Sequence, residues 1–292
     1  MPFCYPDETK DLNERTRKET GGSFVELSGG FTHYELSNAQ AEETVVLVHG
    51  FSVPYIIFDP TFSFLTGAGL RVLRYDLFGR GFSDRPDTEY DMDLFVRQLA
   101  DLLTALGIHQ PVSLLGLSAG GPIAAAFTGL FPDRVAKLVL IDPVGAKPFF
   151  LGRLLKAAAL PVLGEILVGV LVSVPVTRMM AASPFDRERI GAFGSDYVAQ
   201  LRFKGFKRAL LSSVRNDMLG CWLHVYKEVG RMDKPVLLFW GRNDAALPFA
   251  HSDTLRAEIP QAEFHAIEKS GHNPHYEKPE VVNPVLLRFL RQ

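Results

Sequence analysis

The sequence GLSAG at residues 116–120 decides the fold. It directly follows the apolar run PVSLLGL (111–117) and directly precedes the helix-forming stretch PIAAAF (122–127). A G-x-S-x-G between a strand and a helix is typical of a nucleophile elbow, in which the serine occupies a strained turn and needs small neighbours. The pattern predicts that Ser118 points its hydroxyl away from a sheet. The alternative is an ordinary strand–turn–helix whose serine takes no part in chemistry.

A serine hydroxyl is a weak nucleophile at neutral pH, so it needs a base. The best candidate is His272 in SGHNP (270–274), a loop between a predicted strand and the last helix. From there a side chain can reach across the carboxyl edge of a sheet. His275 is the alternative base. The remaining candidates are interpreted as surface or packed residues: His33, His109, His224, His251 and His265.

The base in turn needs an acid that orients it. Asp244 directly follows KPVLLFWGRN (234–243), at the carboxyl end of the strand before the one that leads to His272. The chain order Ser118, Asp244, His272 is the order that this type of fold requires. Asp142 also ends a predicted strand near the same edge and is the alternative acid.

The negative oxygen of a tetrahedral intermediate needs two N–H donors. The N–H of Ala119 lies at the positive end of the predicted helix that follows Ser118. A second donor is expected after the run TVVLVH (44–49), where Gly50 lets the backbone approach the site and Phe51 offers its N–H. His49 is interpreted as structural, because the base is already assigned elsewhere.

From Thr44 onward, short apolar runs alternate with helix-length segments, as expected for parallel strands buried on both faces. The sequence therefore predicts an α/β fold with a doubly wound, mostly parallel sheet. The expected strands are TVVLVH (44–49), LRVLRYD (70–76), PVSLLGL (111–117), AKLVLID (136–142), KPVLLFW (234–240) and AEFHAIE (262–268). SFVELSG (23–29) and FTHYELS (31–37) predict an antiparallel hairpin at the sheet edge. Leucine spacing over 94–106 and the stretch 279–290 predict helices.

About ninety residues between Asp142 and Lys234 interrupt this alternation with apolar helical patterns and no convincing strand. They predict a helical cap inserted into the sheet domain. The expected organisation is an N-terminal arm at 1–20, which we interpret as a mobile or surface segment, an α/β core at 21–146 and 231–292, and the cap at 147–230.

The composition excludes several classes of protein. With 47% apolar and 22% charged residues the chain is an ordinary globular protein. Its 31 basic and 33 acidic residues give a net charge of −2, so no overall field favours nucleic acid as a partner. Cys4 and Cys221 indicate neither a disulfide framework nor a metal site. The two cysteines fit a reducing cytoplasm. The first twenty residues lack the apolar core of a secretory signal.

Five short motifs in this order resemble landmarks of the α/β-hydrolase superfamily. They are HGF (49–51), DLFGRGFSD (76–84), GLSAG (116–120), GRNDAALP (241–248) and GHNPHYEKPE (271–280). The resemblance covers nearly the whole chain outside the cap. It implies a catalytic triad of Ser118, Asp244 and His272, an oxyanion hole made by the N–H groups of Phe51 and Ala119, and a lid over the site.

The resemblance implies no cofactor, and the residues agree. The Gly79-Arg80-Gly81 segment does not complete a dinucleotide fingerprint, because Asp84 stands where the third glycine belongs. Nor does the chain contain a phosphate-cradling P-loop sequence.

Within the superfamily the chain is most similar to carboxylesterases and monoacylglycerol-lipase-like members. Members with an aspartate nucleophile, such as haloalkane dehalogenases and epoxide hydrolases, are disfavoured because residue 118 is serine. Hydrolases that cleave a C–C bond in ring-fission products and cofactor-free haloperoxidases also use serine and stay as alternatives. A catalytically silent receptor is an alternative outside enzymology.

The cap adds an expectation about the substrate. Its first half, 148–176, is unusually apolar and is interpreted as an acyl-binding roof, as simple packing onto the core or, less favoured, as a membrane contact. The later cap carries a basic cluster of Arg202, Lys204, Lys207, Arg208 and Arg215, interpreted as a solvated face or a contact for acidic groups. The expected activity is hydrolysis of small apolar carboxylic esters with small to medium acyl chains, with the oligomeric state left open.

Overall fold

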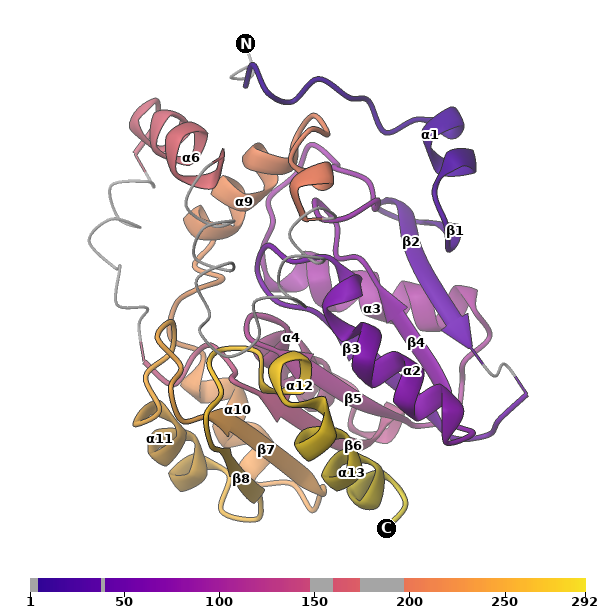
Figure 1. Ribbon diagram of the computed structural model, residues 1–292, viewed down its shortest axis with the longest axis vertical. Helices are drawn as coiled ribbons and strands as arrows, with labels where there is room; N and C mark the ends of the chain where they lie inside the picture. The colour runs from indigo at the N-terminus through magenta and orange to yellow at the C-terminus, as the bar shows by residue number, and fades with distance from the viewer. Residues whose placement is uncertain (1–4, 38–39, 148–159, 174–196) are drawn as a thin grey trace.

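The computed structural model describes residues 5–37, 40–147, 160–173 and 197–292. In this part of the chain, strands form an eight-stranded sheet in the order β1-β2-β4-β3-β5-β6-β7-β8 (Figure 1). The strands are β1 (Ser23–Leu27), β2 (Gly30–Ser37), β3 (Thr44–Val48), β4 (Arg71–Tyr75), β5 (Val112–Leu117), β6 (Val135–Ile141), β7 (Val236–Gly241) and β8 (Glu263–Ile267).

The predicted fold class is confirmed. All pairings from β4 through β8 are parallel, and the six predicted parallel strands end within two residues of the observed bounds. The edge hairpin is confirmed as well, because β1 pairs antiparallel with β2 and β2 pairs antiparallel with β4. The order of the strands doubles back at β3 and β4, which brings the carboxyl ends of β3 and β5 side by side.

The helices lie mostly between the strands, as the alternation predicts. Asp91 caps the helix after β4 by accepting a hydrogen bond from the Leu94 N–H, and Pro279 begins the last helix. The helices are α1 (Glu14–Glu19), α2 (Asp59–Gly67), α3 (Met92–Ala105), α4 (Gly120–Leu130), α6 (Leu163–Ser173), α9 (Phe206–Arg215), α10 (Leu223–Gly230), α11 (His251–Glu258), α12 (Pro274–Glu277) and α13 (Pro279–Leu290), with 3-10 turns η1 (Tyr55–Phe58) and η2 (Pro132–Arg134).

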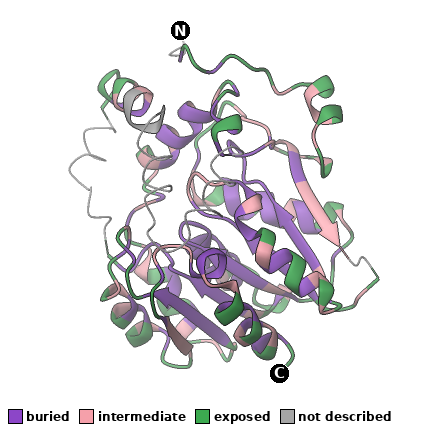
Figure 2. Ribbon diagram, viewed as in Figure 1, coloured by how far each residue is buried: buried purple, intermediate pink, exposed green. Residues whose placement is uncertain are grey.

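Two hydrophobic cores sandwich the sheet. In β3, Val46 and Val48 point into the core shared with α3, α4, α10 and α11, whereas Val45 and Leu47 point into the core shared with α2 and α13. Successive side chains of a strand face opposite sides, so a strand buried on both faces must be apolar throughout. Figure 2 shows the result, with buried strands in the middle and exposed residues on the outer sides of the helices.

Glycines allow the turn between β5 and α4 to pack tightly against the sheet. A Cβ atom at Gly116 would lie 2.4 Å from the carbonyl oxygen of Gly120, and one at Gly120 would lie 2.2 Å from the carbonyl oxygen of Val48. Backbone atoms at these distances leave no room for a side chain. Gly116 is therefore required by contact with the start of α4, and Gly120 by contact with the end of β3.

The described part of the N-terminal arm is anchored to the cap. Tyr5 and Glu8 are buried, and the Glu8 carboxylate accepts hydrogen bonds from the N–H groups of Gly205 and Lys207 at 2.8 and 2.7 Å. The Lys10 N–H donates to the carbonyl of Arg202. The arm thus adds a packed layer to the cap. The exact division into arm, core and cap stays a prediction.

Four of the five residues in the basic cluster of the cap are paired with carboxylates, and the fifth, Arg202, is exposed. The pairs are Lys204 with Asp11, Lys207 with Asp7, Arg208 with Asp87 and Arg215 with Glu165, at 2.6 to 3.0 Å. Lys207 is only 1% exposed, which contradicts a solvated position for that residue. Sequence reasoning missed these partners because they are distant along the chain.

The apolar first half of the cap is only partly described. In α6, Val168 packs against Leu211 of α9, and the two helices lie side by side (Figure 1). At the start of the described stretch 160–173, four large apolar side chains are exposed: Leu160, Val162, Leu163 and Ile166. Residues 148–159 and 174–176 lie outside the described residues, so the roof, packing and membrane interpretations stay predictions. No helix in the described ranges is long and apolar enough to cross a membrane.

Replacing Gly120 by alanine should destabilise the protein, because the new methyl group meets backbone oxygens that cannot move alone. We expect a loss of about 1–3 kcal/mol or more in the free energy of unfolding, measured by urea titration. Gly67→Ala is the matched control: it lies in open space in α2 and should be neutral or stabilising by up to about 1 kcal/mol. Equal unfolding midpoints for the two variants would contradict the tight packing of the turn.

Candidate active site

Ser118 occupies the sharp turn between β5 and α4. Its φ of 52° lies in the left-handed region, which is unfavourable for a residue with a side chain. Its N–H donates to the carbonyl of Ile141 at 2.9 Å, and its carbonyl accepts from the N–H groups of Gly121 and Val144 at 3.0 Å each. These bonds hold the strained conformation, and the residue stays 8% exposed.

The structure brings Ser118 and His272 together. The Nε2 atom of His272 lies 3.0 Å from the Oγ atom of Ser118, although the two residues are 154 positions apart in the chain. His272 follows β8 in the loop that leads to α12. The predicted base therefore lies within hydrogen-bonding reach of the predicted nucleophile.

Asp244 lies on the other side of the His272 ring. Its Oδ2 atom is 2.7 Å from Nδ1 of His272, and its Oδ1 atom accepts hydrogen bonds from the N–H groups of Ala246 and Leu247 at 2.8 Å each. A carboxylate only accepts, so the proton between the two residues belongs to Nδ1. The Nε2 atom is then free to accept the proton of the Ser118 hydroxyl.

The charge of Asp244 tunes His272. Burial lowers the pKa of His272, but the charge and the hydrogen bond of Asp244, helped by the charge of Glu277, outweigh it and hold the pKa above its usual value. The side chain of His272 is 25% exposed, whereas that of Asp244 is fully buried. The arrangement favours an imidazole that binds a proton readily next to Ser118.

Glu277 is a supporting residue that the sequence reasoning missed. Its carboxylate accepts hydrogen bonds from the N–H groups of Gly271 at 2.7 Å and Asn273 at 3.2 Å, on both sides of His272. It also accepts from the Ser270 hydroxyl at 3.3 Å. The available signal was an acidic residue in the quoted GHNPHYEKPE motif. Glu277 fixes the backbone of the loop that carries the histidine.

Asp142, the alternative acid, is fully buried beside this pair. Its Oδ1 atom accepts from the N–H of Gly241 at 2.8 Å, and within the described residues its Oδ2 atom has no hydrogen-bond partner. Burial, reinforced by the charge of Asp244, raises the pKa of Asp142 well above its usual range. The carboxyl that contacts His272 is that of Asp244.

Three possible metal-ligand atoms, from Asp142, Asp244 and His272, lie within 4.8 Å of one another. Asp244 and His272 already bond each other. The raised pKa of Asp142 favours its neutral form, which is a poor metal ligand.

The backbone next to Ser118 offers the predicted N–H donors. A Cβ atom at Gly50 would lie 3.2 Å from Cβ of Ser118, so the loop approaches the serine closely. Within the described part of the chain, the N–H groups of Phe51 and Ala119 donate to no other residue. Ala119 directly precedes α4, where the helix dipole favours negative charge.

His49 is built into the backbone of this region. Its Nε2 atom accepts from the N–H of Leu77 and its Nδ1 atom donates to the carbonyl of Gly50, both at 2.8 Å. Burial lowers the pKa of His49 to about 4, so the ring is neutral at physiological pH. Its contacts are those of a structural residue.

His275, the alternative base, is fully buried and packs against the ring of Phe58, with 5.0 Å between the ring centroids. Burial lowers the pKa of His275 to about 3. Its ring nitrogens make no hydrogen bond to Ser118. The histidine within hydrogen-bonding distance of the Ser118 hydroxyl is therefore His272, and not His275.

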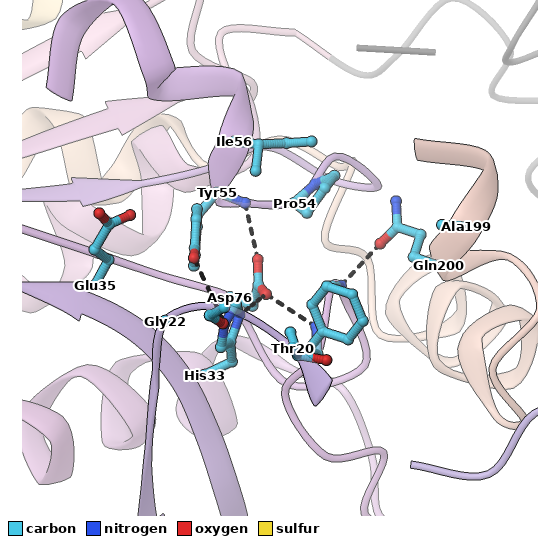
Figure 3. A pocket seen from close by; sticks show the side chains of 13 residues that line it. Thr20, Gly22, His33, Glu35, Pro54, Tyr55, Ile56, Asp76, Ala199 and Gln200 are labelled. Carbon is cyan, nitrogen blue, oxygen red and sulfur yellow. Dashed lines mark hydrogen bonds and ion pairs between the residues drawn. The ribbon is translucent and has the colours of Figure 1, made fainter. Parts of the chain in front are cut away.

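A separate cavity of about 320 Å³ lies beside His33 (Figure 3). The Nδ1 atom of His33 lies 2.7 Å from Oδ2 of Asp76, and its Nε2 atom lies 2.7 Å from the carbonyl oxygen of Gly21. Both ring nitrogens are thus engaged. None of Ser118, Asp244 and His272 lines this cavity, so it is distinct from the candidate active site.

The sequence matches the family model described as "Alpha/beta hydrolase family" over residues 45–285. A related protein is the 2-hydroxy-6-oxononadienedioate/2-hydroxy-6-oxononatrienedioate hydrolase of Klebsiella pneumoniae, 30% identical over 269 residues, which are 85% of this chain and 87% of that protein. A putative non-heme chloroperoxidase of Synechocystis is 28% identical over 261 residues, which are 86% of this chain and 92% of that protein.

Solved structures share the fold. A thermophilic esterase from Thermogutta terrifontis superposes with a TM-score of 0.76 at 22% identity and covers 93% of this chain and 98% of the esterase. At this identity the likeness establishes the architecture and leaves the substrate open.

The ring of His272 should titrate above the ordinary histidine value of about 6.5, because Asp244 stabilises its charged form. NMR of the ring nitrogens measures this pKa directly. In Asp244→Asn the pKa should fall, since the negative charge that raises it is lost. Asp142→Asn is the control and should shift the pKa much less. An unchanged pKa in Asp244→Asn would contradict the assigned contact.

Proposed function

The chain belongs to the alpha/beta hydrolase family, and on this premise we propose that it is a serine hydrolase that cleaves carboxylic esters. The observation that carries the proposal is the continuous hydrogen-bonded series from Ser118 through His272 to Asp244, at 3.0 and 2.7 Å. A serine that contacts a base, with a carboxylate that orients this base, is the arrangement of an activated nucleophile.

The first half of the reaction acylates Ser118. Its Oγ atom attacks the ester carbonyl carbon while Nε2 of His272 takes the hydroxyl proton. The carbonyl oxygen becomes negative and receives hydrogen bonds from the N–H groups of Phe51 and Ala119. When the tetrahedral intermediate collapses, the bond to the leaving oxygen breaks, and that oxygen takes the proton from His272 and departs as an alcohol.

The second half releases the acid. A water molecule gives a proton to Nε2 of His272 and attacks the acyl carbon, and the same two N–H groups stabilise the negative oxygen. Collapse of this intermediate breaks the bond to Oγ of Ser118, which recovers its proton from His272. Throughout, Asp244 keeps Nδ1 of His272 protonated and stabilises the imidazolium that forms.

The preference for esters has two supports. Return of a single proton from His272 to an alkoxide leaving group requires no further acid or cofactor. Relatives of the same fold include esterases. The acyl chain is proposed to be small or medium and apolar, in keeping with the apolar sequence of the cap.

C–C bond hydrolysis is the second candidate. It is favoured by relatives named as 2-hydroxy-6-oxononadienedioate/2-hydroxy-6-oxononatrienedioate hydrolases, which match up to 96% of this chain at 28–30% identity. In that case the leaving group would be a carbon atom that accepts the proton. The same residues could serve both reactions, so only turnover distinguishes them.

Initial rates on p-nitrophenyl esters from acetate to palmitate should show turnover with a maximum at a small or medium chain length. Ser118→Ala should lower this turnover by at least about 10³-fold, because the nucleophile is lost. Ser113→Ala, in the strand β5 that leads to Ser118, is the matched control and should keep the rate. If the wild-type protein instead converts only a coloured ring-fission product, the C–C candidate replaces the ester proposal.

Asp244→Asn should lower kcat by up to about 10⁴-fold, because the amide stabilises the wrong tautomer of His272. The rate of the wild-type enzyme should rise with pH as His272 loses its proton. The midpoint of that rise should lie above about 6.5 and move to lower pH in Asp244→Asn, because the pKa of His272 is raised by Asp244. Asp142→Asn should keep kcat within about tenfold, and the reverse ranking of the two variants would identify Asp142 as the acid.

A further inference from the structure

Three consecutive carbonyl groups of the loop 50–52, which carries the Phe51 N–H, are each held by a buried side chain. The Gly50 carbonyl accepts from Nδ1 of His49 at 2.8 Å. The Phe51 carbonyl accepts from Nε of Arg80 at 2.8 Å, and the Ser52 carbonyl accepts from Nε2 of Gln200 at 2.9 Å. Only the first of these donors is a sequence neighbour of the loop.

Arg80 is an unusual donor because it is a buried cation. It is 1% exposed, and its other nitrogens donate to the Phe78 carbonyl at 3.1 Å and to the Ser213 hydroxyl at 2.8 Å. Among the described residues it pairs with no carboxylate. Burial lowers the pKa of Arg80 to about 10, so it stays charged at neutral pH.

A buried cation without a carboxylate is costly, so its position calls for a reason. The guanidinium lies near the rings of Phe51, Tyr90 and Phe95, at 5.4, 5.8 and 5.2 Å from their centroids. Aromatic faces and neutral oxygens leave its positive charge uncancelled. Arg80 therefore holds the Phe51 carbonyl through a charge-assisted hydrogen bond.

Gln200 reaches the loop from the cap side. Its Nε2 atom donates to Ser52, and its Oε1 atom accepts from the N–H of Gly81 at 2.8 Å (Figure 3). The side chain thus joins the loop 50–52 to the loop that contains Arg80. Since Arg80 also bonds Ser213 of α9, both side chains connect the backbone beside Ser118 to the cap.

We propose that Arg80 and Gln200 are positioning residues that hold the Phe51 N–H in the geometry needed to bind the oxyanion, and that they make this geometry depend on the placement of the cap. The proposal rests on the proposed function, in which Phe51 is an oxyanion donor. An oxyanion donor must lie about 2.7–3.1 Å from the negative oxygen. Arg80 and Gln200 together form what we call the clamp of the loop 50–52. Loss of either side chain would let the Phe51 N–H move out of that range.

The test compares Arg80→Met, Arg80→Lys and Gln200→Met with Arg85→Met in the full-length protein. Arg85 is the matched control, because it also donates to backbone carbonyls of the loop that contains Arg80, those of Gly81 and Ser83. Its side chain has no hydrogen bond to the described loop 50–52. Two rates are measured: p-nitrophenyl ester turnover, and modification of Ser118 by a fluorophosphonate, which needs the oxyanion site but no particular substrate.

Arg80→Met should lower kcat and the modification rate by about tenfold to a hundredfold, less than or comparable to removal of a whole oxyanion donor. KM should change by less than about threefold, because the clamp acts in the transition state. Arg80→Lys keeps the charge and should recover part of the loss. Gln200→Met should also lower both kcat and the rate of Ser118 modification. Arg85→Met should lower only the midpoint of unfolding and leave these two rates unchanged.

The outcomes separate the proposals. If Arg80→Met and Gln200→Met react with the fluorophosphonate at the rate of Arg85→Met, the proposal that Arg80 and Gln200 position the Phe51 N–H is overturned. Because loss of a buried arginine can unfold a protein, Gln200→Met and Arg80→Lys carry the test if Arg80→Met does not fold. A wild-type protein that labels at Ser118 but hydrolyses no ester overturns the ester proposal alone. Failure to label at Ser118 overturns both.

Discussion

Backbone crowding at the turn between β5 and α4 is the constraint on which the rest of the site depends. Ser118 has a left-handed φ of 52°, and Gly120 lies so close to Val48 that a Cβ atom would be 2.2 Å from its carbonyl oxygen. The turn can exist only because neighbouring strands hold it, through the bonds to Ile141 and Val144. In return, the strained turn lifts the hydroxyl above the sheet edge, where side chains from other strands can reach it.

The surroundings of Asp142 and Asp244 explain which of the two carboxylates pairs with His272. Asp142 and Asp244 both follow strands that end at this edge, and both are buried. Two adjacent buried carboxylates cannot both ionise easily. Asp244 receives two backbone N–H groups and the histidine, whereas Asp142 receives one N–H, and its pKa is raised. The histidine thus pairs with the carboxylate that accepts more hydrogen bonds.

The parts predictable from the sequence are those set by local pattern. Apolar runs predicted the strands closely, and the motif GLSAG together with the order of Asp244 and His272 predicted which side chains meet. Contacts between distant polar residues had no such pattern. Glu277 holds the histidine loop, and Arg80 bonds the Phe51 carbonyl. Neither contact follows from periodicity, because each depends on how loops from different strands pack at the sheet edge.

The N-terminal arm shows why charge clusters are hard to interpret from sequence. The basic residues of the cap have no acidic neighbour in the same stretch, yet Asp7 contacts the buried Lys207 through both carboxylate oxygens at 2.6 Å. A buried ammonium group is tolerated only with such partners. Glu8 at the same time satisfies the N–H groups of Gly205 and Lys207 at the start of α9. Since α9 also carries Ser213, which bonds Arg80, the arm stabilises the helix through which the cap reaches the backbone beside Ser118.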